Sequence, residues 1–178
     1  GPIASRDWFE ARAEEVFSLV PPEKVVLGLG SYGYNWRGGR APAESVTYEE
    51  AMVTARDEHA SIAFDPGSLN PHFDYTDDDG TPHSVWLLDA ATMYNSLAGE
   101  RKQKPLGAAM WVLGSEDPGV WTFLRRGKLG QPAAPSALRP ISFHQEVETD
   151  GLGEILRIDS QPADGIRDVQ FGPDGYIT

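Results

Sequence analysis

The segment that most constrains this chain is KVVLGLGSYGYNW, residues 24–36, because its two halves differ in character. The first half is a short apolar run, β-branched at its start and without alternation, which predicts a strand buried on both faces. The second half places Tyr32, Tyr34 and Trp36 where that strand ends. Ligands of parallel α/β sheets bind at the carboxyl ends of the strands, where flat rings suit the apolar face of a sugar or a nucleobase. The alternative is that each ring caps the core.

A second segment, PLGAAMWVL at residues 105–113, has the same apolar character and carries an aromatic ring near its end. It predicts a second strand buried on both faces. An amphipathic helix is expected before each strand, one over 7–20 with Asp7 as its cap and one over about 90–101 with Asp89 as its cap. A helix followed by a strand, repeated in this way, is typical of an α/β fold.

The residues between the two predicted strands indicate a small α+β insertion, at about 40–89. Thr47 and Glu50 have the spacing of a capping box and predict the start of a helix. Residues 62–64 predict a short strand, and alternating runs on both sides of the Asp-Asp-Asp-Gly sequence at 77–80 predict a hairpin. The three aspartates lack the ligand spacing of a calcium loop, so we interpret them as turn residues.

The composition changes after the last predicted helix. Residues 127–137 are rich in Gly, Pro and Ala and indicate a linker. Runs with a period of two follow at 141–147, 154–158 and 167–171, separated by Gly, Asp or Pro. They predict a β-rich unit within 138–178, which is either a spacer or the start of a following domain.

The charge balance narrows the range of partners. The chain has 15 Lys plus Arg against 27 Asp plus Glu, a formal net charge of -12. Such a surface repels phosphate backbones and anionic membranes, so nucleic-acid binding is not expected, whereas a neutral glycan is compatible with it. No apolar run reaches the ~20 residues of a membrane span, and no leader pattern opens the chain. Because the sequence begins at Gly1 without Met, we expect a piece of a longer protein.

The sequence contains no motif that predicts a metal site or a cofactor site. The absence of cysteine excludes disulfides, thiol nucleophiles and thiolate metal sites. The histidines, His59, His72, His83 and His144, are scattered without metal-ligand spacing, so no zinc site is expected. His72 and His83 are predicted to lie near each other across the hairpin as solvent-exposed loop residues. No phosphate-binding glycine loop or Gly-x-Ser-x-Gly elbow is present, and no cofactor is expected.

Glu116 and Asp117 are the obvious acidic pair. Glycosidases need two carboxyl groups that face each other across the bond, commonly ~5–9.5 Å apart, and adjacent residues at a helix start rarely achieve this. We therefore interpret the pair as capping groups of a helix that opens near Pro118 and ends at Gly127.

The order of these parts resembles glycoside hydrolase family 18, the chitinase-like barrels. The resemblance rests on LGSYGYNW at 29–36, on GAAMWVLGSEDP at 107–118, and on HSVWLLD at 83–89 as the exit of the insertion. It covers about residues 1–126. It implies an α/β fold in which the chain forms the C-terminal part of a (β/α)8 TIM barrel, strands 7 and 8, with the α+β insertion between them.

A narrower likeness involves GPIAS at 1–5, GSEDP at 114–118 and the tail at 153–178. These segments resemble bacterial multidomain proteins in which a family-18-like domain precedes a polysaccharide deacetylase domain and a family 2 glycosyltransferase. The resemblance then implies that the tail is the spacer before the deacetylase, and that the parent protein acts outside the cytoplasm or in the cell envelope. Whether the parent is anchored in a membrane stays open.

The resemblance also implies a chemistry. Family 18 enzymes cleave β-1,4-linked N-acetylglucosamine glycans by substrate-assisted retaining hydrolysis, in which the N-acetyl oxygen is the nucleophile and one Glu is the acid. That Glu ends an Asp-x-x-Asp-x-Asp-x-Glu motif, which these 178 residues lack, together with the tyrosine and aspartate of the sixth strand. The fragment alone is therefore expected to be inactive, without a catalytic residue of its own, and to need the upstream half of the barrel.

The same resemblance assigns the binding residues. It implies that Trp111 floors the subsite of the sugar whose bond breaks, and that Tyr32, Tyr34 and Trp36 line the cleft. The first alternative is a non-catalytic glycan-binding module attached to a deacetylase or glycosyltransferase. The second is a scaffold without affinity for sugars.

Overall fold

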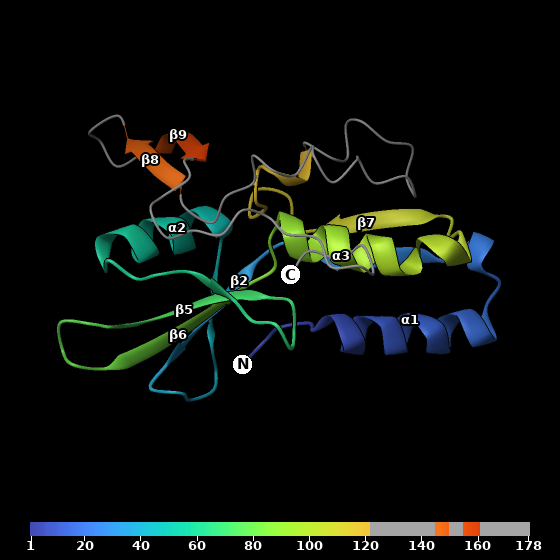
Figure 1. The fold of residues 1–178 in the computed structure, drawn as a ribbon, viewed down its shortest axis with the longest axis horizontal. Helices are drawn as coiled ribbons and strands as arrows, with labels where there is room; N and C mark the ends of the chain where they lie inside the picture. The colour runs from blue at the N-terminus through green and yellow to red at the C-terminus, as the bar shows by residue number, and fades with distance from the viewer. Residues whose placement is uncertain (122–144, 150–154, 161–178) are drawn as a thin grey trace.

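The computed structural model describes residues 1–121, 145–149 and 155–160 of the chain (Figure 1). This part mixes helices and strands, as the predicted α/β class requires. The α-helices are α1 (Arg6–Leu19), α2 (Tyr48–Asp57) and α3 (Ala90–Glu100), and short 3-10 helices lie at Pro22–Lys24 and Arg101–Gln103. The strands are β1 (Val26–Gly30), β2 (Gly33–Arg37), β3 (Glu44–Val46), β4 (Ala63–Phe64), β5 (Pro71–Thr76), β6 (Pro82–Leu87), β7 (Gly107–Trp111), β8 (Gln145–Thr149) and β9 (Ile155–Ser160).

The two predicted apolar strands lie side by side and run parallel, which confirms the central prediction. β1 pairs with β7 in a register that starts at Val26 opposite Gly107 and ends at Gly30 opposite Trp111. Helices α1 and α3 contact each other and lie on the same side of the molecule as β7 (Figure 1). The carboxyl ends of both strands therefore lie together.

The prediction that both strands are buried on two faces is wrong. Leu27 and Leu29 are buried on one face of β1, and Leu29 packs in a core cluster with Met93 of α3. On the other face the side chain of Val26 is 51% exposed and that of Trp111 is 71% exposed. Glycine and alanine do not interrupt an apolar pattern, so the pattern does not show which faces are covered, and within the described residues the second face has no covering layer.

The residues between β1 and β7 form a five-stranded antiparallel sheet in the order β3-β2-β6-β5-β4, with α2 packed on one face. Phe73, Val85 and Leu87 of the sheet are buried against Met52 of the helix. The capping box at Thr47 is confirmed, and the hairpin that joins β5 to β6 is confirmed as well. In Figure 1 this sheet and α2 lie on the opposite side of the molecule from α1, α3 and β7.

One local prediction needs correction. Helix α1 is capped by Ser5, whose hydroxyl accepts from Trp8 N, and not by Asp7, which pairs with Arg6 instead. The aromatic segment after β1 forms a strand of its own, β2, because its backbone pairs with β3 on one side and β6 on the other. By contrast, Asp89 caps α3 as predicted, accepting from Thr92 N at 2.8 Å.

The C-terminal predictions are tested only in part. β8 and β9 form an antiparallel pair, in agreement with strands predicted in 141–147 and 154–158. The predicted linker at 127–137 and the strand at 167–171 lie outside the described residues. A helix is expected to open near Pro118. The backbone becomes helical at Val120, one residue before this described range ends.

Gly33 marks the point where the chain leaves the parallel pair and enters the antiparallel sheet. A Cβ atom at this position would lie 2.5 Å from Leu87 Cδ2 and 2.9 Å from the backbone oxygen of Trp86. Because one of these neighbours is backbone, it cannot move aside cheaply. A Cβ atom on Gly28 of β1, by contrast, would meet nothing within 4 Å.

We therefore expect Gly33→Ala to lower the free energy of unfolding by about 1 to 3 kcal/mol through overpacking. Gly28→Ala is the matched control, because it makes the same change in a strand with open space, and its effect should stay within about 0.5 kcal/mol. Denaturant unfolding of the two variants measures the difference. Equal effects of the two substitutions would contradict the close approach of β2 to β6 at Gly33.

Candidate functional site

The face of the antiparallel sheet opposite α2 carries a group of aromatic side chains. Strand register places Tyr34, Trp86 and His72 in one row across β2, β6 and β5. The next row consists of Trp36, Ser84 and Asp74 in the same order. Because paired residues of antiparallel strands point to the same side, the six side chains share one face, which we call the aromatic face.

Ring contacts connect the aromatic face to the carboxyl end of β1. Tyr32, which follows that strand, contacts Tyr34 edge to face with ring centroids 5.5 Å apart, and Tyr34 contacts Trp36 in the same way at 6.3 Å. Edge-to-face geometry is favourable for aromatic pairs and leaves parts of the ring faces free. Burial, and then the neighbouring Tyr34, raise the pKa of Tyr32, so its hydroxyl stays a neutral hydrogen-bond donor and acceptor.

A hollow of about 300 Å³ lies beside Trp36, with Asp74 and Ser84 in its lining. The Ser84 hydroxyl accepts from Trp86 Nε1 at 3.1 Å, which anchors that indole ring. The indole N–H of Trp36 is buried and has no acceptor among the described residues. The hollow therefore combines an aromatic ring, a hydroxyl and a carboxylate, the groups that proteins use to hold the apolar face and the polar rim of a small ligand.

Trp111 lies at the carboxyl end of β7, beside the start of the aromatic series. Its carbonyl accepts from Ser31 N at 2.7 Å, and the Ser31 hydroxyl donates to the carbonyl of Val112 at 3.1 Å. The peptide between Trp111 and Val112 is cis. The backbone is thus held while the indole ring is exposed, and among the described residues this ring makes no contact with the rings of the aromatic face. The structure brings Tyr32, Tyr34 and Trp36 together and leaves Trp111 apart from them.

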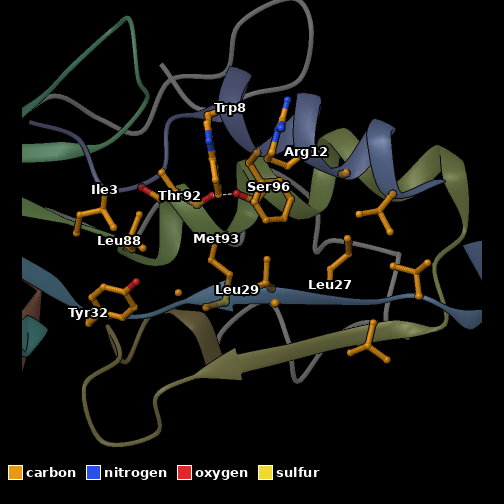
Figure 2. A pocket seen from close by; sticks show the side chains of 18 residues that line it. Ile3, Trp8, Arg12, Leu27, Leu29, Tyr32, Leu88, Thr92, Met93 and Ser96 are labelled. Atoms are coloured by element: carbon orange, nitrogen blue, oxygen red, sulfur yellow. Dashed lines mark hydrogen bonds between the residues drawn. The ribbon is translucent and has the colours of Figure 1, made fainter. Parts of the chain in front are cut away.

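A second cavity, of about 420 Å³, runs along the edge of β1 that pairs with no strand among the described residues (Figure 2). Trp8 and Arg12 of α1 lie on one side of it, and Leu27 and Leu29 of β1 lie on the other. Its lining is mostly apolar, and Tyr32 closes the end nearest the aromatic face. The cavity therefore lies between a helix and the strand edge, where a sheet would continue.

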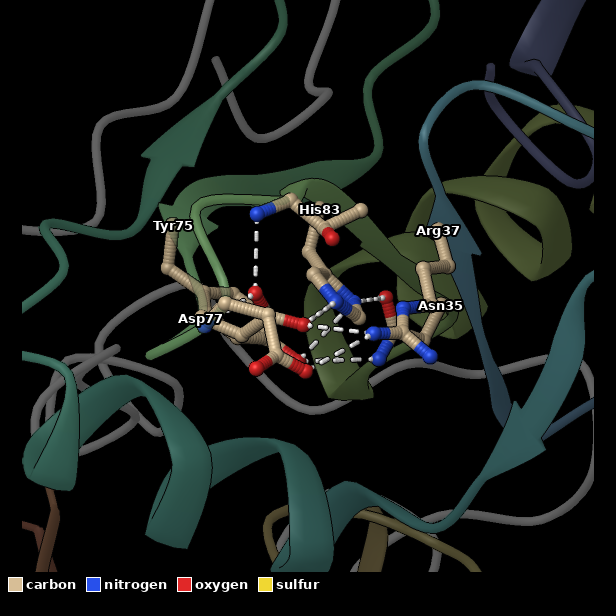
Figure 3. Close-up of polar contacts among 7 residues, drawn as sticks. Asn35, Arg37, Tyr75, Asp77 and His83 are labelled. Carbon is tan, nitrogen blue, oxygen red and sulfur yellow. Dashed lines mark hydrogen bonds and ion pairs between the residues drawn. The ribbon is translucent and has the colours of Figure 1, made fainter.

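The opposite face of the sheet carries a polar cluster at the hairpin tip (Figure 3). The ring of His83 has a partner at each nitrogen, with Nδ1 2.9 Å from Asn35 Oδ1 and Nε2 3.2 Å from Asp77 Oδ2. Arg37 also bonds Asp77, at 3.0 Å, and Tyr75 stacks on the imidazole ring. The N–H of Thr81 first, then His83 and Arg37, lower the pKa of the Asp77 carboxyl.

This cluster corrects the prediction for two histidines. His83 lies on β6 with a largely buried ring, and His72 lies on β5 stacked on Trp86, so neither is an exposed loop residue. The sequence signal that was missed is the alternation of the hairpin strands, which sends His72 and Trp86 to the aromatic face. His144 lies outside the described residues. Among the residues that the structure describes, no three His, Asp or Glu side chains form a metal-binding group.

The acidic pair predicted at 116–117 divides between two roles. Glu116 accepts from the Gly114 N–H in an exposed turn. Asp117 is fully buried and accepts from Ala90 N at 3.0 Å, which places it beside Asp89 at the start of α3. Burial, and then the charge of Asp117, raise the pKa of Asp89 to about 7. Burial also raises the pKa of Asp117. Asp117 also accepts from the Gly119 N–H at 2.7 Å, as the cap of a helix that opens near Pro118 would, whereas Glu116 bonds a residue that precedes this point.

Comparisons with known proteins agree with this fold. The cortical fragment-lytic enzyme of Bacillus subtilis (strain 168) is 33% identical over 115 residues, which are 62% of this chain and 27% of that protein. The crystal structure of the spore cortex-lytic enzyme SleL from Bacillus megaterium QM B1551 matches 70% of this chain and 30% of its own, with 26% identity and a TM-score of 0.64. A chitinase from Chromobacterium violaceum ATCC 12472 matches 68% of this chain and 38% of its own, with 26% identity and a TM-score of 0.63.

In this part of the chain the fold is thus similar to that of cortex-lytic enzymes and chitinases. The chain spans about a quarter of the length of the curated relatives it matches. No protein-family model matches it. In the described ranges, no helix combines the length and the apolar character needed to cross a membrane.

The buried pair Asp89 and Asp117 predicts a pH dependence of stability. The folded state holds the Asp89 proton up to about pH 7, whereas the unfolded chain releases it near 3.8. The free energy of unfolding should therefore fall as the pH rises through this window, by about 4 kcal/mol, and level off above it. Asp89→Asn keeps the helix cap and removes the charge, so its stability should change much less with pH.

Chemical denaturation of the wild type and of Asp89→Asn at several pH values measures this slope. Asp78→Asn, in the exposed hairpin turn, is the control for loss of one carboxylate and should keep the wild-type slope. A slope that Asp89→Asn leaves unchanged would contradict the assignment of the raised pKa to Asp89.

Proposed function

We propose that this chain forms part of the glycan-binding cleft of a chitinase-like glycosidase that takes a β-1,4-linked N-acetylglucosamine polymer. The observation that carries the proposal is the aromatic series Tyr32, Tyr34 and Trp36, which starts at the carboxyl end of a parallel strand pair that also ends in exposed Trp111. An aromatic ring binds the apolar face of a pyranose ring by stacking on it, without needing charge. The similarity to cortex-lytic enzymes and chitinases agrees with a glycan substrate.

In this proposal β1 and β7 are strands 7 and 8 of a (β/α)8 barrel, and 40–89 is its insertion. The free edge of β1 and the cavity beside it support this placement, because a preceding strand and its neighbours would pair and pack there. The exposed face that carries Val26 and Trp111 would then turn toward the barrel interior. The partner of the chain is thus the upstream half of the barrel in the same parent protein.

We propose further that the parent hydrolyses its glycan with retention, using the N-acetyl group of the substrate as the nucleophile and an upstream Glu as the acid. The residues described here bind and orient the sugar, and none of them is assigned a proton-transfer role. The parent acts outside the cytoplasm or in the cell envelope, fused to a polysaccharide deacetylase and a glycosyltransferase. The second candidate is a non-catalytic glycan-binding module, which an upstream acidic motif without its last Glu would favour.

Trp111→Ala should weaken binding of N-acetylglucosamine hexamer by about tenfold or more, because an exposed stacking surface is lost. Leu113→Ala is the matched control, since Leu113 is 68% exposed in the turn that follows the same strand. Titration calorimetry on the full-length parent protein measures the affinity of the wild type and of each variant for the hexamer. Equal affinity of the wild type and Trp111→Ala would contradict the proposed cleft.

The same proteins also distinguish the hydrolase from the non-catalytic glycan-binding module. Release of shorter oligosaccharides from the hexamer by the wild type supports the hydrolase. Binding that depends on Trp111 without any release of products supports the non-catalytic module.

A further inference from the structure

We propose that the hollow beside Trp36 holds a glucosamine unit whose amine is free, so that the cleft accepts partially deacetylated glycans. This inference rests on the proposed function, since it names the kind of sugar that the far end of the same surface takes. The residues that carry it are Trp36, Ser84 and Asp74, which register places side by side across β2, β6 and β5.

The geometry of the hollow fits a single sugar ring. Its volume of about 300 Å³ lies at the lower end of the range for small-ligand sites. Trp36 supplies an aromatic surface, and it is the last ring of the series that begins at Tyr32 beside the parallel strands. An oligosaccharide that stacks along this series would therefore bring a later unit, and not its first, to the hollow.

Asp74 decides which sugar unit the hollow prefers. Its carboxylate is exposed, and among the described residues no cationic side chain pairs with it. The guanidinium of Arg37 on β2 lies on the opposite face and bonds Asp77. At the position that differs between the two sugars, an N-acetylated unit would offer this carboxylate only a neutral amide N–H. A free amine in its protonated form is an ammonium group, which makes a stronger, charge-assisted hydrogen bond.

Two further features favour a cationic sugar. An ammonium group close to the face of Trp36 gains cation–π attraction in addition to its hydrogen bond with Asp74. The net charge of -12 gives the chain a negative field, which raises the local concentration of a polycation and repels an anionic ligand. Trp36 alone would bind either form of the sugar, whereas Asp74 together with this field discriminates between them.

The test compares two hexamers, fully N-acetylated and partially deacetylated, against the wild type, Asp74→Asn and Asp78→Asn of the intact protein. Asp74→Asn should weaken binding of the partially deacetylated hexamer by about fivefold, the size expected of an exposed ion pair, and leave the fully acetylated hexamer unchanged. Asp78→Asn removes the same charge from the adjacent turn and should change neither affinity. Raised ionic strength should shrink the effect of Asp74→Asn.

The outcomes distinguish this inference from the proposed function. If Asp74→Asn affects both hexamers equally, or neither, the inference is overturned while a cleft that depends on Trp111 still stands. If the wild type binds neither hexamer, both proposals fail. If Asp78→Asn has the same effect as Asp74→Asn, the preference comes from net charge alone, and the hollow is not its source.

Discussion

The parallel pairing of β1 with β7 is the interaction on which the rest of the structure depends. Its register brings Gly30 opposite Trp111, so both strands end at the same level. Backbone and side-chain hydrogen bonds from Ser31 to the residues that end and follow β7 hold the two ends together. Without this pairing, the exposed indole of Trp111 and the start of the aromatic series would have no fixed relation, because they are far apart in sequence.

The second constraint is the use of the two faces of the antiparallel sheet. Alternation along β5 and β6 sends Phe73 and Val85 to the core beneath α2, while His72 and Trp86 go to the other face. The same pleat that buries the core therefore assembles the aromatic face and places Asp74 beside it. The alternation of side chains along β5 and β6 therefore produces both the aromatic face and the buried core of the antiparallel sheet.

Much of this fold could be predicted from the sequence, because its signals are local. The capping box at Thr47, the Asp89 cap and the Asp-Gly hairpin each depend on neighbouring residues, and the parallel pair followed from two apolar runs. Predictions failed where distant residues decide the outcome. One-sided burial of β1, the pairing of β2 with β6 and the meeting of Asp89 with Asp117 all depend on contacts that no local pattern encodes.

The central claim is that the aromatic face and Trp111 form one glycan-binding surface. The indole N–H resonances in the NMR spectrum of labelled protein report on each tryptophan separately during titration with N-acetylglucosamine hexamer. We predict that Trp36 and Trp111 shift together along one binding curve, while Trp8 on α1 does not move. Shifts confined to Trp8, or different curves for Trp36 and Trp111, would contradict the claim.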